Sequence, residues 1–350
     1  MITSDKTSFD QYKGQTISKF SLINSHGTRI SVLDFGATWF EYTLHRVDDT
    51  FQNVLLNEPD IAHYLNNPFY LGATIGRVAG RIGNGRFQLD GKTFLLQQNE
   101  GTTTLHGGPN GFAYQNWTGK IVTDAQGDDS LQFSLTATQT MDSFPGTMHV
   151  TTTYTLDEND QVTIVYEATS DKDTLFSPTC HAYFNLNRDQ QNVRNHQIKS
   201  NAETVEALDE RHVPNGILSP LQKDMYDYHD FVSVGDAIDA IISAHQGAGI
   251  DDTFSTPNGS DVFIRDDQTH LVLRTTGDRN GVTIFTANGF NANMQTNKGV
   301  GRPFLGLAVE PHILSNAINL KGLGNMVLKA NTTQRYSAHY HVYEEGGATQ

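Results

Sequence analysis

The chain has 350 residues, 37% hydrophobic and 18% charged, so it can bury a large core without disulfide or metal staples. Its formal net charge of −15 disfavours anionic partners, namely nucleic acids, membrane surfaces and highly anionic substrates. The single cysteine, Cys180, excludes an intramolecular disulfide and a four-cysteine zinc site. We expect a cytoplasmic protein, because no secretory signal and no run of roughly 20 apolar residues is visible.

Strand signals dominate the first third of the chain. Short segments of β-like composition predict strands at 19–23, 29–34, 38–45 and 51–56. A brief helix is expected over 58–65, with Asn57 as its N-cap. The segment 87–95 predicts a hairpin, because Asp90-Gly91 forms a turn dipeptide between two alternating strands.

The middle of the chain continues the β pattern. Two hairpin-like pairs are expected, 117–122 with 131–136 and 148–156 with 162–168. The polar segment 187–235 predicts long irregular loops. The clearest helix is predicted over 236–245, where apolar residues share one face, and it ends before Gly247 and Gly249.

The last hundred residues predict further strands at 262–264, 271–275, 282–286, 307–312 and 336–343. No linker, short-period repeat or alternation of strand and helix is visible. We therefore expect one large, mostly antiparallel all-β domain over residues 1–350, with long loops and few short helices.

The segment 177–186 gathers a histidine, a thiol, a phenol and an amide between the two β-rich halves. Pro178 favours an extended entry, because its ring clashes with a helical conformation of Ser177. In an extended chain successive side chains alternate faces, so His181, Tyr183 and Asn185 would share one face. Cys180, Ala182 and Phe184 would share the other. A polar, titratable row backed by an apolar row suits the floor of a ligand site, although a buried structural histidine fits the segment equally well.

Glu310 differs from most other acids of the chain. It follows three apolar residues and precedes Pro311, so it is expected at the end of a buried strand. Burial raises the pKa of a carboxyl toward the range of a useful base, whereas a buried ion pair is the structural alternative. Asp251, between Ile250 and a downstream Phe254, is the other acid with apolar surroundings.

Other candidates carry weaker signals. Arg77, Arg81 and Arg86 do not share one face of a regular element, so we expect one of them at a site. Cys180 is expected to pack in the core rather than to act as a nucleophile. His339 and His341 have metal-ligand spacing but no third ligand nearby, so a strand face is the favoured interpretation.

The remaining candidates are two histidines, one arginine and two buried-looking acids, all on β segments far apart in sequence. This set suits proton transfer to and from a polar, uncharged ligand. It calls for no metal, nucleotide cofactor or covalent intermediate.

Five motifs, in order along the chain, resemble those of the aldose 1-epimerase family, also called galactose mutarotases. Each motif is weak alone, and their order makes the resemblance specific. The motifs are Gly76-Arg77-Val78-Ala79-Gly80-Arg81-Ile82, Leu105-His106-Gly107-Gly108, His181-Ala182-Tyr183-Phe184-Asn185-Leu186, Gly249-Ile250-Asp251 with Phe254, and Glu310-Pro311 with Asn316-Ala317-Ile318-Asn319.

The resemblance implies a large antiparallel β-sandwich of the galactose mutarotase-like supersandwich type. It implies interconversion of the α and β anomers of free aldoses such as glucose or galactose, with no cofactor. By motif, Glu310 matches the general base and His181 the general acid. His106, Arg81 and Asp251 match residues that hold the sugar, and Tyr183 and Phe304 are aromatic candidates for its apolar face.

Two positions depart from the pattern of some family members, which have asparagine where this chain has Gly80 and glutamine where it has Thr283. These departures leave room for a larger sugar such as the disaccharide maltose. The alternatives are a hexose-6-phosphate 1-epimerase, which needs extra cations, and a non-catalytic carbohydrate-binding protein. A polysaccharide lyase or hydrolase would need a carboxylate pair or an extended cleft. The expected partner is a small sugar, and the chain is expected to be a monomer or homodimer.

Overall fold

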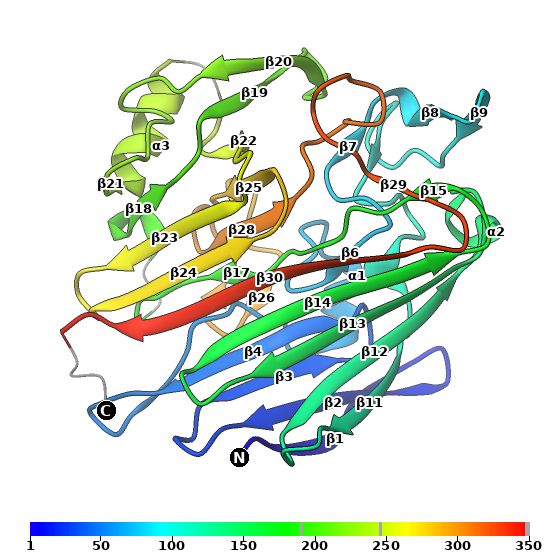
Figure 1. Ribbon diagram of the computed structural model, residues 1–350. Coiled ribbons are helices and arrows are strands. Elements are labelled where there is room, and N and C mark those ends of the chain that lie inside the picture. Colours follow the sequence, from blue (N-terminus) through cyan, green and yellow to red (C-terminus); the bar gives the residue numbers. More distant parts are fainter. Residues whose placement is uncertain (190–191, 245–246, 347–350) are drawn as a thin grey trace.

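The computed structural model describes residues 1–189, 192–244 and 247–346, which are mostly in β-strands (Figure 1). Three sheets of nine, six and five strands carry most of this part of the chain. Within each sheet, neighbouring strands pair antiparallel. The predicted antiparallel all-β architecture is confirmed.

The nine-stranded sheet contains both predicted hairpin-like pairs. In β13 (Met148–Leu156) and β14 (Gln161–Ser170), buried and less buried residues alternate, as expected for strands with one face on the core. The strands are, in spatial order, β11 (Thr118–Thr123), β12 (Asp129–Ala137), β13 (Met148–Leu156), β14 (Gln161–Ser170), β30 (Thr333–Glu344), β24 (Leu271–Gly277), β23 (Ser260–Asp266), β18 (Gln197–Ser200) and β21 (Val232–Ser233).

The other two large sheets lie against this one. The six-stranded sheet runs β17 (Tyr183–Phe184), β28 (Leu307–His312), β25 (Gly281–Phe285), β22 (Asp251–Ser255), β19 (Thr204–Leu208) and β20 (Pro214–Pro220). The five-stranded sheet runs β1 (Thr3–Tyr12), β2 (Gln15–Ile23), β3 (Arg29–Leu33), β4 (Thr38–His45) and β5 (Phe51–Asn53).

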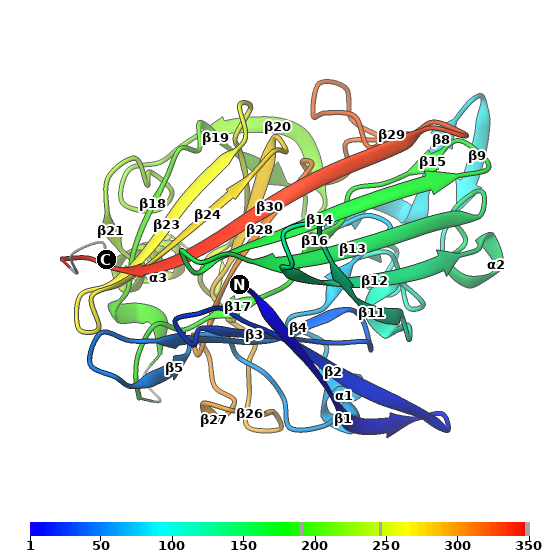
Figure 2. The ribbon, with the colours of Figure 1, turned by 60° about the horizontal axis from the view of Figure 1, so that its bottom comes forward.

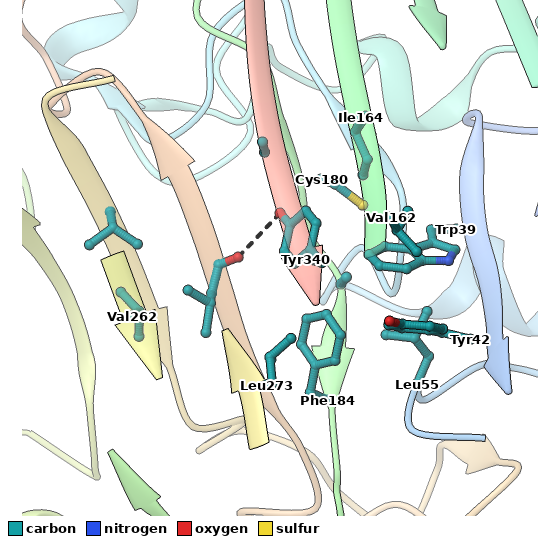
Figure 3. Close-up of a cluster of buried hydrophobic side chains, with 14 of the residues drawn as sticks. Trp39, Tyr42, Leu55, Val162, Ile164, Cys180, Phe184, Val262, Leu273 and Tyr340 are labelled. Atoms are coloured by element: carbon teal, nitrogen blue, oxygen red, sulfur yellow. Dashed lines mark hydrogen bonds between the residues drawn. The ribbon is translucent and has the colours of Figure 1, made fainter. Parts of the chain in front are cut away.

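The main core joins the three sheets into a sandwich. In Figure 2 the blue five-stranded sheet lies below the long strands of the nine-stranded sheet. Trp39 of β4 lies 5.1 Å from Tyr340 of β30 and 5.8 Å from Phe184 of β17, measured between ring centroids (Figure 3). The Tyr340 hydroxyl donates to the Val309 carbonyl at 3.5 Å. One aromatic cluster therefore ties a strand from each sheet together.

The remaining elements are short. The predicted hairpin is confirmed, since β8 (Arg86–Leu89) and β9 (Lys92–Leu95) pair around Asp90-Gly91. The two-stranded sheets are β6 (Thr74–Ile75) with β16 (Thr179–Cys180), β7 (Arg81–Ile82) with β10 (Thr104–Leu105), β8 (Arg86–Leu89) with β9 (Lys92–Leu95), β15 (Thr174–Leu175) with β29 (Val327–Leu328), and β26 (Gln295–Thr296) with β27 (Gly299–Val300). The helices are α1 (Ile61–Asn66), α2 (Gln139–Asp142) and α3 (Val234–Ser243), with 3₁₀ turns η1 (Gly83–Gly85), η2 (Phe112–Tyr114) and η3 (Val193–Asn195).

Both predicted helices exist, but their starts differ from the prediction. Helix α1 is capped by Asp60, whose carboxylate accepts from the His63 backbone N–H, so Asn57 is not the N-cap. Helix α3 begins two residues early, because the Ser233 hydroxyl caps it by accepting from the Asp236 N–H. Its last helical residue is Ser243, and the predicted end at His245 lies outside the described residues.

The prediction of long loops over 187–235 is wrong. This segment contributes β18, β19, β20 and β21 to two large sheets. The strands were hidden by polar residues such as Glu206, which is buried in β19 rather than exposed in a loop. The prediction also missed β1, whose residues are mostly polar and only partly buried.

Candidate active site

A cavity of about 250 Å³ opens on one face of the six-stranded sheet. The strand register places Thr283 opposite Glu310 and Tyr183 opposite Ala308, and paired residues point to the same face. Loops from the first third of the chain close the other side. All six predicted site residues line this cavity, namely Arg81, His106, His181, Tyr183, Asp251 and Glu310.

The segment 177–186 divides its side chains as the alternation predicts, except that Asn185 is not among the residues that line the cavity. Cys180, Ala182 and Phe184 belong to the main core, whereas His181 and Tyr183 line the cavity. Two short strands, β16 and β17, form in place of one continuous strand. Asn185 supports the segment from behind by donating to the Leu305 carbonyl at 2.7 Å.

His181 and Glu310 face each other in the cavity. The distance from His181 Nε2 to Glu310 Oε1 is 3.3 Å, and the two residues are 5% and 1% exposed. The other carboxylate oxygen, Oε2, has no hydrogen-bond partner among the described residues. A buried oxygen without a hydrogen-bond partner is costly. The geometry therefore leaves Oε2 available to accept a hydrogen bond or a proton from a ligand hydroxyl.

Burial shifts the pKa of both groups toward the neutral form. It raises the pKa of Glu310 well above its ordinary value, with a further contribution from the charge of Asp251. It lowers the pKa of His181 to about 3. The attraction between a charged imidazolium and carboxylate at this distance opposes both shifts. In either form, neutral or charged, the pair holds one proton in total.

His106 stands beside this pair as a neutral hydrogen-bond donor. Its ring centroid is 5.3 Å from that of His181, and its Nδ1 accepts from the Gly80 N–H at 3.3 Å. Burial lowers its pKa well below the ordinary value. A neutral imidazole that accepts at Nδ1 carries its hydrogen at Nε2, so His106 can donate to a ligand hydroxyl.

Arg81 and Asp251 supply polar groups at the wall of the cavity. Arg81 forms a bidentate ion pair with Glu100, at 2.7 and 2.8 Å. Glu100 also lines the cavity, so the arginine is held in one orientation by a carboxylate that sequence reasoning missed. Asp251 comes from β22 and keeps contact with solvent.

Tyr183 packs beneath His181. The two rings stack at 4.9 Å, and the Tyr183 hydroxyl donates to the Phe69 carbonyl at 3.0 Å. Because that hydroxyl is already engaged and the residue is 0% exposed, Tyr183 fixes the imidazole more directly than it can bind a ligand hydroxyl.

Sequence reasoning missed several lining residues. Phe69, Tyr70 and Phe285 supply aromatic surface to the cavity, and Phe304, which was predicted for this role, is not among the lining residues. Phe285 lies two residues after Thr283 on β25, so the period of two along that strand could have indicated it. Glu206 gave no signal, because its strand was predicted as loop.

The two departures from the family pattern both fall in the cavity. Gly80 has φ +72°, and a Cβ there would lie 2.2 Å from Ser315 Oγ, so a serine from the Glu310 side fills that space. The Thr283 hydroxyl is hydrogen-bonded to the Thr253 hydroxyl at 2.8 Å and to His312 Nε2 at 2.7 Å, so it belongs to a network within the sheet.

The other sequence candidates lie elsewhere. Arg77 is fully buried and pairs with Asp142 at 2.6 Å. Arg86 lies outside this cavity, and Cys180 is buried with its pKa raised to about 12. His339 lies on β30 and bonds to Thr163 at 2.9 Å. Within the described ranges, no group of three or more His, Cys, Asp or Glu residues could hold a metal ion.

The sequence is similar to those of known sugar epimerases. The sequence profile described as aldose 1-epimerase matches residues 18–341. A maltose epimerase from Levilactobacillus brevis is 35% identical over 93% of this chain and 95% of its own length. An aldose 1-epimerase from Streptococcus thermophilus is 30% identical, over 91% and 92%.

Solved structures share the fold. A galactose 1-epimerase from Lactobacillus acidophilus superposes with a TM-score of 0.84 at 21% identity, over 98% of this chain and 99% of that one. An aldose epimerase homologue from C. elegans gives a TM-score of 0.82 at 24% identity, over 93% and 98%. The helices in the described part of this chain all fall short of the length and apolar character needed to cross a membrane.

Proposed function

The chain belongs to the aldose 1-epimerase family, and from that premise we propose that it interconverts the α and β anomers of free aldoses by acid/base ring opening and closure. The observation that carries the proposal is the His181–Glu310 pair, 3.3 Å apart at the floor of a sugar-sized cavity. Glucose and galactose are the first candidate substrates. Maltose is a further one, because a relative is named for it.

Ring opening requires one proton to leave the anomeric hydroxyl and one to reach the ring oxygen. Glu310, as the carboxylate, takes the proton of the anomeric hydroxyl at Oε2, the oxygen that has no hydrogen-bond partner among the described residues. His181, as the imidazolium, delivers the second. Rotation about the C1–C2 bond turns the other face of the aldehyde toward the hydroxyl, and the reverse transfers close the ring.

The electrostatics of the pair suit this cycle. Before ring opening the pair is charged, and after it both members are neutral, with one proton present throughout. Burial favours the neutral members, so it lowers the energy of the state that accompanies the open-chain sugar. His106 and Arg81 hold ring hydroxyls, Asp251 accepts from them, and Tyr183 stacks behind His181.

The two rival functions have less support. Among the described lining residues, Arg81 is the single lysine or arginine, and Glu100 already neutralises it. A 6-phosphate would therefore lack a free cation in the cavity. A non-catalytic sugar-binding protein would not need a buried histidine and carboxylate in contact at its floor, since burying both is costly without a chemical use.

Polarimetry of freshly dissolved α-glucose, α-galactose and β-maltose, with and without the pure protein, tests the proposal. We expect faster approach to rotational equilibrium with at least one free aldose and little effect on glucose 6-phosphate. No acceleration with any free aldose would refute the enzymatic function. The single domain, the cytoplasmic location and the monomeric or dimeric state stay predictions from the sequence.

A further inference from the structure

A second buried acid, Glu206, lines the same cavity as Glu310, at a distance from the proposed catalytic pair. On β19 and β22, Val205 is paired with Phe254, which brings Glu206 beside Thr253. Thr253 is paired with Thr283, and Thr283 with Glu310. The four residues form a row across adjacent strands, with Glu310 and Glu206 at its ends.

The length of this row exceeds one sugar ring. Neighbouring strands lie about 4.8 Å apart, so three intervals separate the backbones of Glu206 and Glu310 by roughly 14 Å. A pyranose with a hydrogen bond at each end is shorter than that. The two residues between the acids are threonines, whose side chains are shorter than those of glutamate and leave room for a ligand above them.

Glu206 has no fixed partner for its carboxyl group. It is 4% exposed, and neither Oε1 nor Oε2 meets a donor at hydrogen-bond geometry among the described residues. Burial raises its pKa to about 8, against smaller lowering effects of the nearby Thr253 hydroxyl and the Ser315 backbone N–H. At neutral pH the side chain is therefore mainly the carboxylic acid, which can both donate and accept.

The network in the row fixes what Glu206 can do. His312 donates from Nδ1 to the Ile313 carbonyl at 2.5 Å, and its pKa is lowered to about 4 by burial, so its Nε2 is an acceptor. Thr283 must then donate to His312, at 2.7 Å. Thr253 must in turn donate to Thr283, at 2.8 Å.

With its hydrogen committed, the Thr253 hydroxyl can only accept from Glu206. This arrangement favours the acid form of Glu206, because only a carboxyl O–H can pair with a Thr253 oxygen whose own hydrogen points to Thr283. The carbonyl oxygen of the carboxyl group is left to accept from a ligand hydroxyl. The row therefore presents a defined acceptor at the end of the cavity away from Glu310.

We propose that Glu206 forms a second sugar subsite, which accepts a hydroxyl of a further ring attached to the reducing aldose. This inference rests on the proposed epimerase function and names reducing disaccharides as a substrate class of the same site. The reducing ring lies over His181 and Glu310, and the attached ring lies over Thr253 and reaches Glu206. Leu208 and Pro214 supply apolar surface at that end.

The test compares mutarotation of glucose and maltose by the full-length protein and three variants. Glu206→Leu removes the acceptor, and we expect KM for maltose to rise roughly three- to tenfold, as for loss of one hydrogen bond. KM for glucose should stay within about twofold of its original value, since one ring does not reach residue 206. Glu206→Gln keeps both a donor and an acceptor, so it should retain most of the maltose affinity.

Glu58→Leu is the matched control. Glu58 is equally buried, with its pKa raised to about 7 by burial and one oxygen without a partner, but it does not line the cavity. It should leave the ratio of the two KM values unchanged. Circular dichroism and urea unfolding establish that each variant is folded.

Three outcomes would overturn the subsite. They are equal effects of Glu206→Leu on glucose and maltose, an effect of Glu58→Leu on the KM ratio as large as that of Glu206→Leu, and acceleration of glucose without any acceleration of maltose by the unmodified protein. Each of these leaves the epimerase function standing. Failure to accelerate either sugar would instead refute the proposed function itself.

Discussion

Glu310 Oε1 lies 3.3 Å from His181 Nε2, although the two residues are 129 positions apart in the sequence. Strands β17 and β28 are hydrogen-bonded neighbours, with Tyr183 paired to Ala308, so the backbone brings His181, two residues before Tyr183, close to Glu310. Rigid strands hold a catalytic pair more accurately than loops do. Glu310 is thus held by a strand, and His181 by the link between β16 and β17, whose backbone is hydrogen-bonded to Gly72 and Ala73.

Removing either member of this pair should abolish most of the turnover. We expect Glu310→Gln and His181→Asn each to lower kcat by about 10²–10⁴-fold, the usual contribution of one general acid or base. KM should change little, because His106, Arg81 and Asp251 still hold the sugar. Polarimetry at saturating sugar measures kcat directly.

The double variant tests whether the two residues act as a unit. If they do, its kcat should fall little below that of the worse single variant, because each transfer is useless without the other. Multiplicative losses would show that the two groups act independently. A loss that appears only in KM would argue for binding roles.

The rate should be nearly independent of pH around neutrality. Activity needs one proton on the pair, and it is lost when a second is added or the last is removed. Burial lowers the pKa of His181 to about 3, so the second proton is added only in strongly acid solution. Burial raises the pKa of Glu310 well above its ordinary value, so the last proton leaves only toward alkaline pH.

Values of kcat/KM between pH 5 and 9, corrected for the spontaneous reaction, check this prediction. A fall on the acid side with a midpoint near the ordinary histidine pKa of about 6.5 would contradict it, because His181 would then titrate as if exposed to water. Far-UV circular dichroism at each pH separates titration from unfolding.

The Arg77–Asp142 ion pair should matter for stability and not for sugar binding. Arg77 is 0% exposed and donates to both oxygens of Asp142, at 2.6 and 3.1 Å, and to the carbonyls of Ala137, Pro145 and Gly146. Arg77→Ala leaves a buried carboxylate without its partner, which costs about 3–5 kcal/mol of unfolding free energy.

Urea unfolding measures this loss, and KM for glucose at a temperature where the variant is folded provides the second readout. The matched variant Arg77→Ala with Asp142→Asn should recover part of the stability, because no buried charge remains. A large rise in KM without loss of stability would instead show that Arg77 contributes to sugar binding.

Much of this fold could be predicted from periodicity, and the reasons for failure are local. In β13 and β14 one face packs on the core, so polar and apolar residues alternate and the strands were visible. In β1 and β19 the alternation is lost. The residues of β1 are largely solvated, and β19 buries an acid against a polar cavity.

The site was predictable in its members but not in its contacts. His181 and Glu310 gave separate signals, a polar row after Pro178 and an acid after an apolar run, and the family resemblance joined them. The Arg81–Glu100 pair and the donor order from Thr253 to His312 depend on which strands become neighbours. Sequence spacing does not contain that information for a sheet built from distant segments.

Gly80 should be the position in the cavity wall least tolerant of a side chain. Its φ of +72° costs about 1–2 kcal/mol for a residue with a Cβ, and that Cβ would meet Ser315 Oγ at 2.2 Å. Its N–H also donates to His106 Nδ1, so strain at Gly80 displaces His106, a proposed sugar-binding residue. Gly80→Ala should therefore lower unfolding free energy and raise KM for glucose more than it lowers kcat.

A second substitution separates the two causes. Ser315→Gly removes the contact but leaves φ unchanged, so Gly80→Ala with Ser315→Gly should recover part of the stability and part of KM, but not all of either. Gly80→Asn with Ser315→Gly should recover more, since asparagine tolerates the left-handed region better than alanine does. Urea unfolding and polarimetry on the four proteins give both quantities. No recovery from Ser315→Gly would mean that backbone conformation alone makes glycine necessary here, and that the serine does not fill the space of a missing side chain.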